Sequence, residues 1–166
     1  TNKVFPFPEH KITNVLGDKE KMLECKEGVF KIIDMFKKFY KDSHGKLIPV
    51  RAEVVVGDEE WAVTGMIDQL FFNEKSKQLE IWDWKTNKAI KKVNKWQKFK
   101  EPLSHLDVCE LNTYSLQLSF YRLIVERNTD LVLGDSYIVW FNENNNEYKV
   151  MKCYDFRDEI LKIMKK

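Results

Sequence analysis

The sequence has few of the residues that mark fibrous, disordered or covalently stapled proteins. Its 166 residues include four prolines, six glycines and three cysteines. This composition excludes collagen and Pro/Gly-rich disorder, and it does not fit a repeat array or a coiled coil. Hydrophobic residues make up 43% of the chain and aromatic residues 13%. At this length a domain buries roughly 70% of the surface of its unfolded chain, so we predict a single domain over residues 1–166.

The cysteines and the lack of long apolar runs limit the environment and the cofactors. Cys25, Cys109 and Cys153 are odd in number and form no CxxC pair. We therefore expect reduced thiols without zinc or an iron–sulfur cluster, in a reducing compartment such as the cytoplasm. No run approaches eighteen apolar residues, so we expect a soluble protein with no membrane partner. The chain starts without Met, and we expect it to begin inside a longer gene product.

Hydrophobic periodicity predicts the order helix, three strands, helix, two strands and helix. Pro6 and Pro8 predict an extended lead-in before the first helix. Short polar connections between the first three strands favour an antiparallel meander. The predicted elements are helices at about 19–40, 110–127 and 154–166, and strands at about 50–56, 61–72, 78–85, 136–141 and 147–153.

Three charged residues on the predicted strands could carry chemistry. Side chains alternate across a strand, so Asp83 and Lys85 in QLEIWDWK share a face. Asp68 lies in an apolar run of the preceding strand, and Glu53 is a candidate third carboxylate. Mg²⁺ is usually held by one or two carboxylates with waters and phosphate oxygens, and a nearby lysine can assist phosphodiester hydrolysis. Taken singly, each acid is more often a surface or salt-bridged residue than a ligand.

Together these residues resemble a known family. GMIDQLFF and IWDWKTN look like the GxxD and (D/E)xK motifs of the PD-(D/E)XK nuclease superfamily, specifically its RecB-like exonuclease branch. QLSFY in the second helix is similar to the QxxxY motif of that branch. Gln117 and Tyr121 are four residues apart and so share one helical face, together with Tyr114. The three motifs occur in the family's order and at comparable distances.

The resemblance implies a fold, a cofactor and roles for individual residues. The fold is α/β and restriction-endonuclease-like, an αβββαβ core with a mixed central sheet flanked by helices. Asp68 and Asp83 would bind Mg or Mn, with the carbonyl of Trp84 as a further ligand, and Lys85 would serve the attacking water. Gln117 and Tyr121 would support the site or the DNA strand. The implied activity is that of a DNA exonuclease in repair or recombination, and any helicase or recombination partner is unknown.

Two features depart from the family pattern. RecB-like members carry a histidine on a helix upstream of the GxxD strand, and neither His10 nor His44 is suitably placed. We expect that this helix precedes Thr1. The four-cysteine pattern of the iron–sulfur relatives is also missing, which disfavours that subgroup.

The segment after the DWK motif is strongly basic, although the whole chain has a net charge of only +2. Residues 85–100 contain seven lysines and no acid. We expect this segment to contact single- or double-stranded DNA through Lys88, Lys91, Lys92, Lys95 and Trp96; the alternative is a solvated loop. Trp82 and Trp84, on the face opposite Asp83, are interpreted as core residues. A noncatalytic DNA-binding or assembly module and a superfamily endonuclease stay open as alternative functions.

Overall fold

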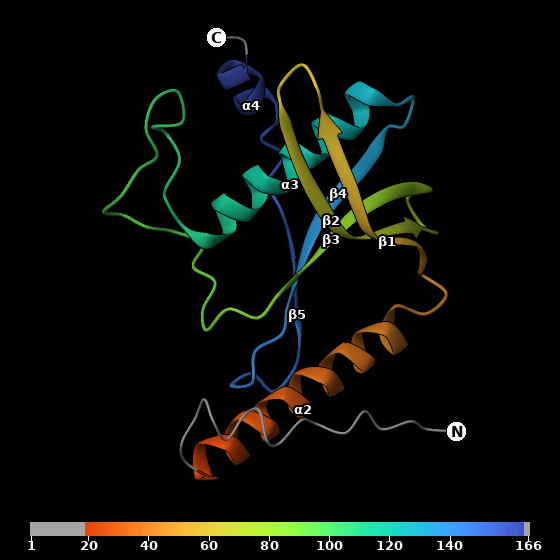
Figure 1. Ribbon diagram of the computed structural model, residues 1–166, viewed down its shortest axis with the longest axis vertical. Helices are drawn as coiled ribbons and strands as arrows, with labels where there is room; N and C mark the ends of the chain where they lie inside the picture. The colour runs from red at the N-terminus through yellow and green to blue at the C-terminus, as the bar shows by residue number, and fades with distance from the viewer. Residues whose placement is uncertain (1–18, 165–166) are drawn as a thin grey trace.

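The computed structural model describes residues 19–164 as a mixed sheet with helices on both faces (Figure 1). The sheet has the order β1-β2-β3-β4-β5, in which β3 and β4 are parallel and the other neighbours are antiparallel. The strands are β1 (Leu47–Asp58), β2 (Val63–Asn73), β3 (Gln78–Lys85), β4 (Leu133–Trp140) and β5 (Lys149–Lys152). The predicted order of elements and the restriction-endonuclease-like α/β class are confirmed.

The helices cover the sheet from opposite sides (Figure 1). Helix α2 (Lys19–Ser43) lies on one face, and α3 (Glu110–Asn128) crosses the other face between β3 and β4, with α4 (Arg157–Met164) packed beside α3. A helical crossover of this kind is what a parallel strand pair requires. Among residues 19–164, no helix combines the length and apolarity needed to cross a bilayer.

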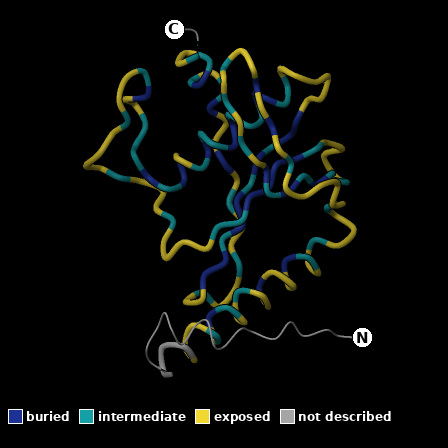
Figure 2. The backbone as a smooth tube through the Cα atoms, viewed as in Figure 1, coloured by how far each residue is buried: buried dark blue, intermediate teal, exposed yellow. Residues whose placement is uncertain are grey.

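Each face of the sheet has its own hydrophobic core, which appears as the dark central tube in Figure 2. The α3 face is mainly aliphatic. Its buried members are Val56, Ile67, Ile81, Leu111, Leu118, Ile124, Leu133, Ile138 and Cys153. The α2 face is mainly aromatic, and its buried members are Met35, Phe39, Phe71, Trp82, Val139 and Phe141. Trp84 packs against the aromatic core, so the interpretation of Trp82 and Trp84 as core residues is confirmed.

The first two strands differ from their predicted bounds for local reasons. The prediction began the first strand after Pro49, but β1 starts at Leu47 because it is an edge strand, where proline is tolerated. The second strand was predicted from residue 61, but β2 starts at Val63. Asp58 Oδ1 accepts a hydrogen bond from the Trp61 N–H at 2.9 Å, which forms a turn there.

The C-terminal part is shorter in regular structure than predicted. The strand predicted over 147–153 is β5, only four residues long. The closing helix was predicted from Tyr154 but begins at Arg157. Ser115 and Ser119 of α3 accept hydrogen bonds from the backbone N–H groups of Tyr154 and Phe156, at 3.0 and 2.9 Å, and hold this stretch extended. The predicted lead-in at Pro6 and Pro8 lies outside the described residues.

Candidate active site

Asp83 and Lys85 lie on the α3 face of β3, as strand alternation predicted. Asp83 is only 2% exposed, and its Oδ2 is in ion-pair contact with the Lys85 ammonium. That oxygen accepts no hydrogen bond of good geometry from any described residue. Burying a carboxylate oxygen without full pairing is costly, so this atom is a candidate ligand for a group that the protein binds.

Asp68 reaches the same point from β2 because the alternation of side chains breaks there. Ile67 and Leu70, three residues apart, both join the α3-side core, whereas Phe71 joins the α2-side core. Asp68 lies at this break, and its Oδ2 accepts a hydrogen bond from the Trp84 N–H at 2.9 Å. The regular β2–β3 pairing ends at Gln69 and Trp82. The Asp68 carboxylate therefore takes the place of the missing backbone partner where the two strands separate.

The electrostatics of the pair follow from this placement. Burial raises the pKa of the Asp83 carboxyl; the Lys85 ammonium opposes this, and the neighbouring Asp68 carboxylate raises that pKa further. Two carboxylates at one point repel each other when both are ionised, and a bound cation removes this repulsion. The site is thus built for a positive charge in addition to that of Lys85.

The residues at this point fit a hard divalent ion. Mg²⁺ takes oxygen ligands from one or two carboxylates and fills its other positions with water or phosphate. The Trp84 carbonyl also faces the site, because the next carbonyl, that of Lys85, accepts the Phe141 N–H on the β4 side and adjacent carbonyls of a strand point to opposite edges. Within the described residues no three acidic, histidine or cysteine side chains gather into a metal cluster. A divalent ion at this point would take its protein ligands from the two carboxylates and this carbonyl.

Glu53 does not lie with Asp68 and Asp83. It lies across the β1–β2 pair from Asp68, between the partners Ala52↔Gln69 and Val54↔Ile67. Its side chain is exposed and its backbone is left-handed, with φ of 51°. Non-glycine residues adopt this conformation rarely. The position of Glu53 coincides with the break in β2 that turns Asp68 toward β3, which connects Glu53 to the site through the backbone.

Helix α3 places three predicted motif side chains over the sheet. The Lys85 ammonium lies 4.5 Å from the centre of the Tyr114 ring, a distance typical of cation–π contact. Gln117 Nε2 donates a hydrogen bond to the Tyr121 hydroxyl at 2.9 Å. A Cβ added to Gly65 would lie 2.3 Å from Tyr121 Cε1. The glycine of the GxxD motif therefore makes room for the tyrosine of QxxxY.

Asn87, which was not predicted from the sequence, connects the end of β3 to α3 and to the end of β4 through hydrogen bonds. Its carbonyl accepts hydrogen bonds from Trp140 Nε1 and Asn142 Nδ2, each at 2.7 Å. Its side-chain Oδ1 accepts one from the Tyr114 hydroxyl at 2.8 Å. Tyr114 thus contacts Lys85 with its ring and Asn87 with its hydroxyl. The only sequence signal for this clamp is that Asn87 directly follows DWKT.

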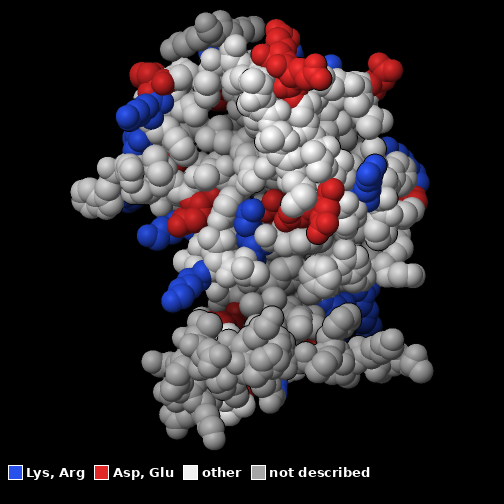
Figure 3. Space-filling model, in the orientation of Figure 1, with Lys and Arg blue, Asp and Glu red and all other residues white. Residues whose placement is uncertain are grey.

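The basic segment between β3 and α3 leaves the sheet beside this site (Figure 1). In Figure 3, basic side chains lie on the side of the molecule where Figure 1 draws this segment, and others lie on the opposite side. The predicted DNA-contacting residues in it are all exposed: Lys88, Lys91, Lys92, Lys95 and Trp96. Within residues 19–164 none of these four lysines forms an ion pair, whereas Lys98 pairs with Asp107.

His44 does not reach the site. His44 lies exposed in the turn after α2, and His10 lies outside the described residues. The helix expected before Thr1 also lies outside them.

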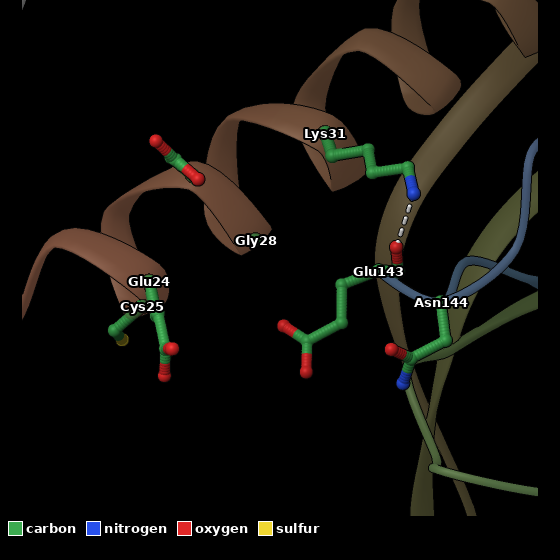
Figure 4. A pocket seen from close by; sticks show the side chains of 7 residues that line it. Glu24, Cys25, Gly28, Lys31, Glu143 and Asn144 are labelled. Atoms are coloured by element: carbon green, nitrogen blue, oxygen red, sulfur yellow. Dashed lines mark hydrogen bonds between the residues drawn. The ribbon is translucent and has the colours of Figure 1, made fainter. Parts of the chain in front are cut away.

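A separate cavity of about 560 Å³ lies between α2 and the turn after β4 (Figure 4). Glu24, Gly28 and Lys31 line it from α2, and Glu143 and Asn144 line it from the turn. The Lys31 ammonium donates to the Glu143 carbonyl across it. It contains none of the residues predicted to act in catalysis, so the candidate site is defined by side-chain chemistry rather than by this cavity.

The comparisons with known proteins agree with the fold. The family model of the PD-(D/E)XK nuclease superfamily matches residues 8–162. A search of curated proteins gave no significant match. The family match covers nearly the whole sequence, including β1 to β5 and the Asp68, Asp83 and Lys85 positions. The chain therefore belongs to the PD-(D/E)XK nuclease superfamily.

Proposed function

We propose that this protein is a nuclease that hydrolyses phosphodiester bonds of DNA with Mg²⁺ or Mn²⁺ and acts as an exonuclease. The observation that carries the proposal is the meeting of Asp68 and Asp83 beside Lys85, with a buried Asp83 oxygen whose one ion-pair partner among the described residues is the Lys85 ammonium. Membership of a superfamily of nucleases supports the same chemistry.

In this proposal the two carboxylates and the Trp84 carbonyl hold the divalent ion. When bound, such an ion lowers the pKa of a water molecule and offsets negative charge on the phosphate. The Lys85 ammonium, held by Asp83 and the Tyr114 ring, lies where it can orient the attacking water or balance charge that develops on the phosphate oxygens. Gln117 and Tyr121 act by positioning, since Tyr121 packs on the Gly65 backbone.

The DNA strand would follow the basic segment that begins directly after Lys85. Four exposed lysines, whose ammonium groups form no ion pair within residues 19–164, supply the charge that attracts a phosphate backbone. Exonuclease action rather than internal cutting rests on the DWKT and QxxxY residues, which resemble the RecB-like branch. A role in DNA repair or recombination would follow from that resemblance.

The test uses end-labelled linear single- and double-stranded DNA and circular single-stranded DNA, each with Mg²⁺ or Mn²⁺. We expect degradation of linear DNA and none of the circle. Asp83→Asn and Lys85→Met should each lower the rate roughly 100-fold or more. The control Asp135→Asn, which removes a half-buried carboxylate that pairs with Lys152 away from the Asp68–Asp83 pair, should keep the rate.

The remaining outcomes identify the alternatives. Cutting of the circle, lost in the same two variants, would replace the exonuclease with an endonuclease of the same superfamily. DNA binding without any cutting would leave a noncatalytic binding or assembly module. Cutting that survives both substitutions would place the active site elsewhere.

A further inference from the structure

Trp96 is the most solvent-exposed of the large hydrophobic side chains described. It is 95% exposed, whereas Trp82 of the aromatic core is 6% exposed. An indole gains roughly 1.5–3 kcal/mol or more when it is buried, so a fully exposed one contributes nothing to the fold through packing. The position of the Trp96 ring is therefore set by the backbone around it rather than by packing of the ring.

Hydrogen bonds hold the backbone on both sides of Trp96. On the N-terminal side, Asn94 Oδ1 accepts the Trp96 N–H at 3.2 Å, and Asn94 Nδ2 donates to the Val108 carbonyl at 2.9 Å. On the C-terminal side, the Gln97 carbonyl accepts the Val108 N–H at 2.9 Å. Asp107 Oδ2 also accepts the Asn94 N–H at 3.0 Å. The turn is thus anchored to residues 107–108, which lead directly into α3.

The charge around this turn is mainly positive, although the Glu110 carboxylate lies at its base, where Oε2 accepts the Lys91 N–H at 3.0 Å. Lys91, Lys92 and Lys95 are exposed, and within residues 19–164 their ammonium groups form no ion pair. Lys98 is excluded from this set because it pairs with Asp107 and helps to close the turn. An exposed aromatic ring among unpaired cations has the composition of a single-strand nucleic-acid platform, where bases stack on rings and lysines follow the phosphates.

We propose that Trp96 stacks on an unpaired base, and that the substrate is therefore single-stranded DNA or a single-stranded tail. This inference rests on the proposed function and deepens it by naming the substrate class. Within a duplex both faces of each base are covered by its neighbours, so an indole reaches a base face only where the strand is unpaired. The fastened turn holds the ring in place before binding, which reduces the entropy lost when a base stacks on it.

The test measures binding without cleavage, by fluorescence anisotropy in EDTA. The ligands are a twelve-residue oligo-dT, an abasic strand with the same number of phosphates, and a blunt hairpin duplex. Trp96→Ala should weaken binding of oligo-dT roughly tenfold or more and leave the abasic strand unchanged. Trp96→Phe should retain most of the affinity, because a ring remains. Lys91→Ala with Lys92→Ala should weaken binding of both strands.

The control is Val132→Ala, a truncation at another exposed site, 74% exposed, before β4. It should leave all three affinities unchanged. Equal losses on the oligo-dT and the abasic strand in Trp96→Ala would overturn the proposal, because the ring would then act only through the loop. A loss confined to the blunt duplex would overturn it as well, because the ring would then cap a terminal base pair.

Cleavage measured in parallel separates this inference from the proposed function. If oligo-dT binding depends on Trp96 but no DNA is cut, the nuclease fails and the single-strand site stands. If DNA is cut and Trp96→Ala lowers cutting of single-stranded and blunt duplex DNA equally, the nuclease stands and the single-strand inference fails.

Discussion

The two faces of the central sheet differ in what they hold. On the α2 face, Phe39 alone lies against six other aromatic rings, with centroid distances from 5.5 to 6.5 Å. On the α3 face, aliphatic residues surround buried polar groups, including Asp83 and Ser115. Strand β3 contributes to both, with Trp82 and Trp84 on one side and Asp83 and Lys85 on the other.

This difference shows how a buried, incompletely paired carboxylate is tolerated. The aromatic face supplies dispersion and hydrophobic stabilisation to the same strand that presents Asp83. The opposite side can then keep an oxygen without a hydrogen bond, which by itself is destabilising. Both faces contribute buried cores to stability, whereas the candidate chemistry lies on the α3 face.

The largest effect is expected from the centre of the aromatic face. Phe39→Ala should lower the free energy of unfolding by about 3–5 kcal/mol, since Phe39 is 1% exposed. Phe30→Ala is the matched control on the same helix, because Phe30 is 47% exposed, and it should change stability by less than about 0.5 kcal/mol. Urea titration measures both. Similar losses in the two variants would contradict the assignment of stability to this core.

A smaller effect is expected where α3 approaches the sheet. The methyl group of Gly65→Ala would lie 2.3 Å from Tyr121 Cε1, so the ring must move, at a cost of about 1–3 kcal/mol. Gly57→Ala is the control, because its added Cβ would meet nothing closer than 3.4 Å. In a Tyr121→Ala background, Gly65→Ala should cost much less. Equal costs in both backgrounds would show that Gly65 does not make room for Tyr121.

Two substitutions of Glu53 test whether this residue serves the backbone conformation or the metal site. Its left-handed φ suits glycine, so Glu53→Gly should leave stability unchanged or raise it by up to about 1 kcal/mol. Because its carboxylate is exposed and apart from the Asp68–Asp83 pair, Glu53→Gln should keep nuclease activity within about tenfold of the wild-type rate. Denaturation and cleavage assays measure the two quantities. Loss of activity in Glu53→Gln to the level of Asp83→Asn would instead establish a third catalytic carboxylate.

The smallest effect concerns the thiol buried on the α3 face. Burial raises the pKa of Cys153 to about 11, above the usual value near 8.5. The folded state therefore favours the neutral thiol, and this stabilisation is complete below about pH 8.5 and is lost as the pH rises toward 11. Between these values Cys153→Ala should lose stability with pH less steeply than the wild type, as followed by thermal unfolding. Parallel pH profiles would contradict this.

Thiol labelling gives an independent check at pH 8. The exposed Cys25 should react with a disulfide reagent in the native protein, and Cys153 should react only after unfolding.

Strand alternation was enough to predict which residues of β3 face each core, because the period of two holds through Trp82, Asp83, Trp84 and Lys85. It was not enough for β2, because the alternation breaks at Asp68, opposite the left-handed Glu53 of the partner strand. The start of α4 depends on serine hydroxyls of α3, which no pattern near Tyr154 reveals. The basic segment was recognised from its lysines. The hydrogen bond from Asn94 to Asp107 that holds it joins residues thirteen positions apart, which no local pattern reveals.

The most direct test of the central claim is Mn²⁺ binding followed by electron paramagnetic resonance, in the wild type and in Asp68→Asn, Asp83→Asn and Asp135→Asn. We expect Mn²⁺ binding in the wild type and in Asp135→Asn, and at least tenfold weaker binding in each of the other two variants. Unchanged Mn²⁺ affinity in both Asp68→Asn and Asp83→Asn would contradict it, because the two carboxylates would then not form the metal site.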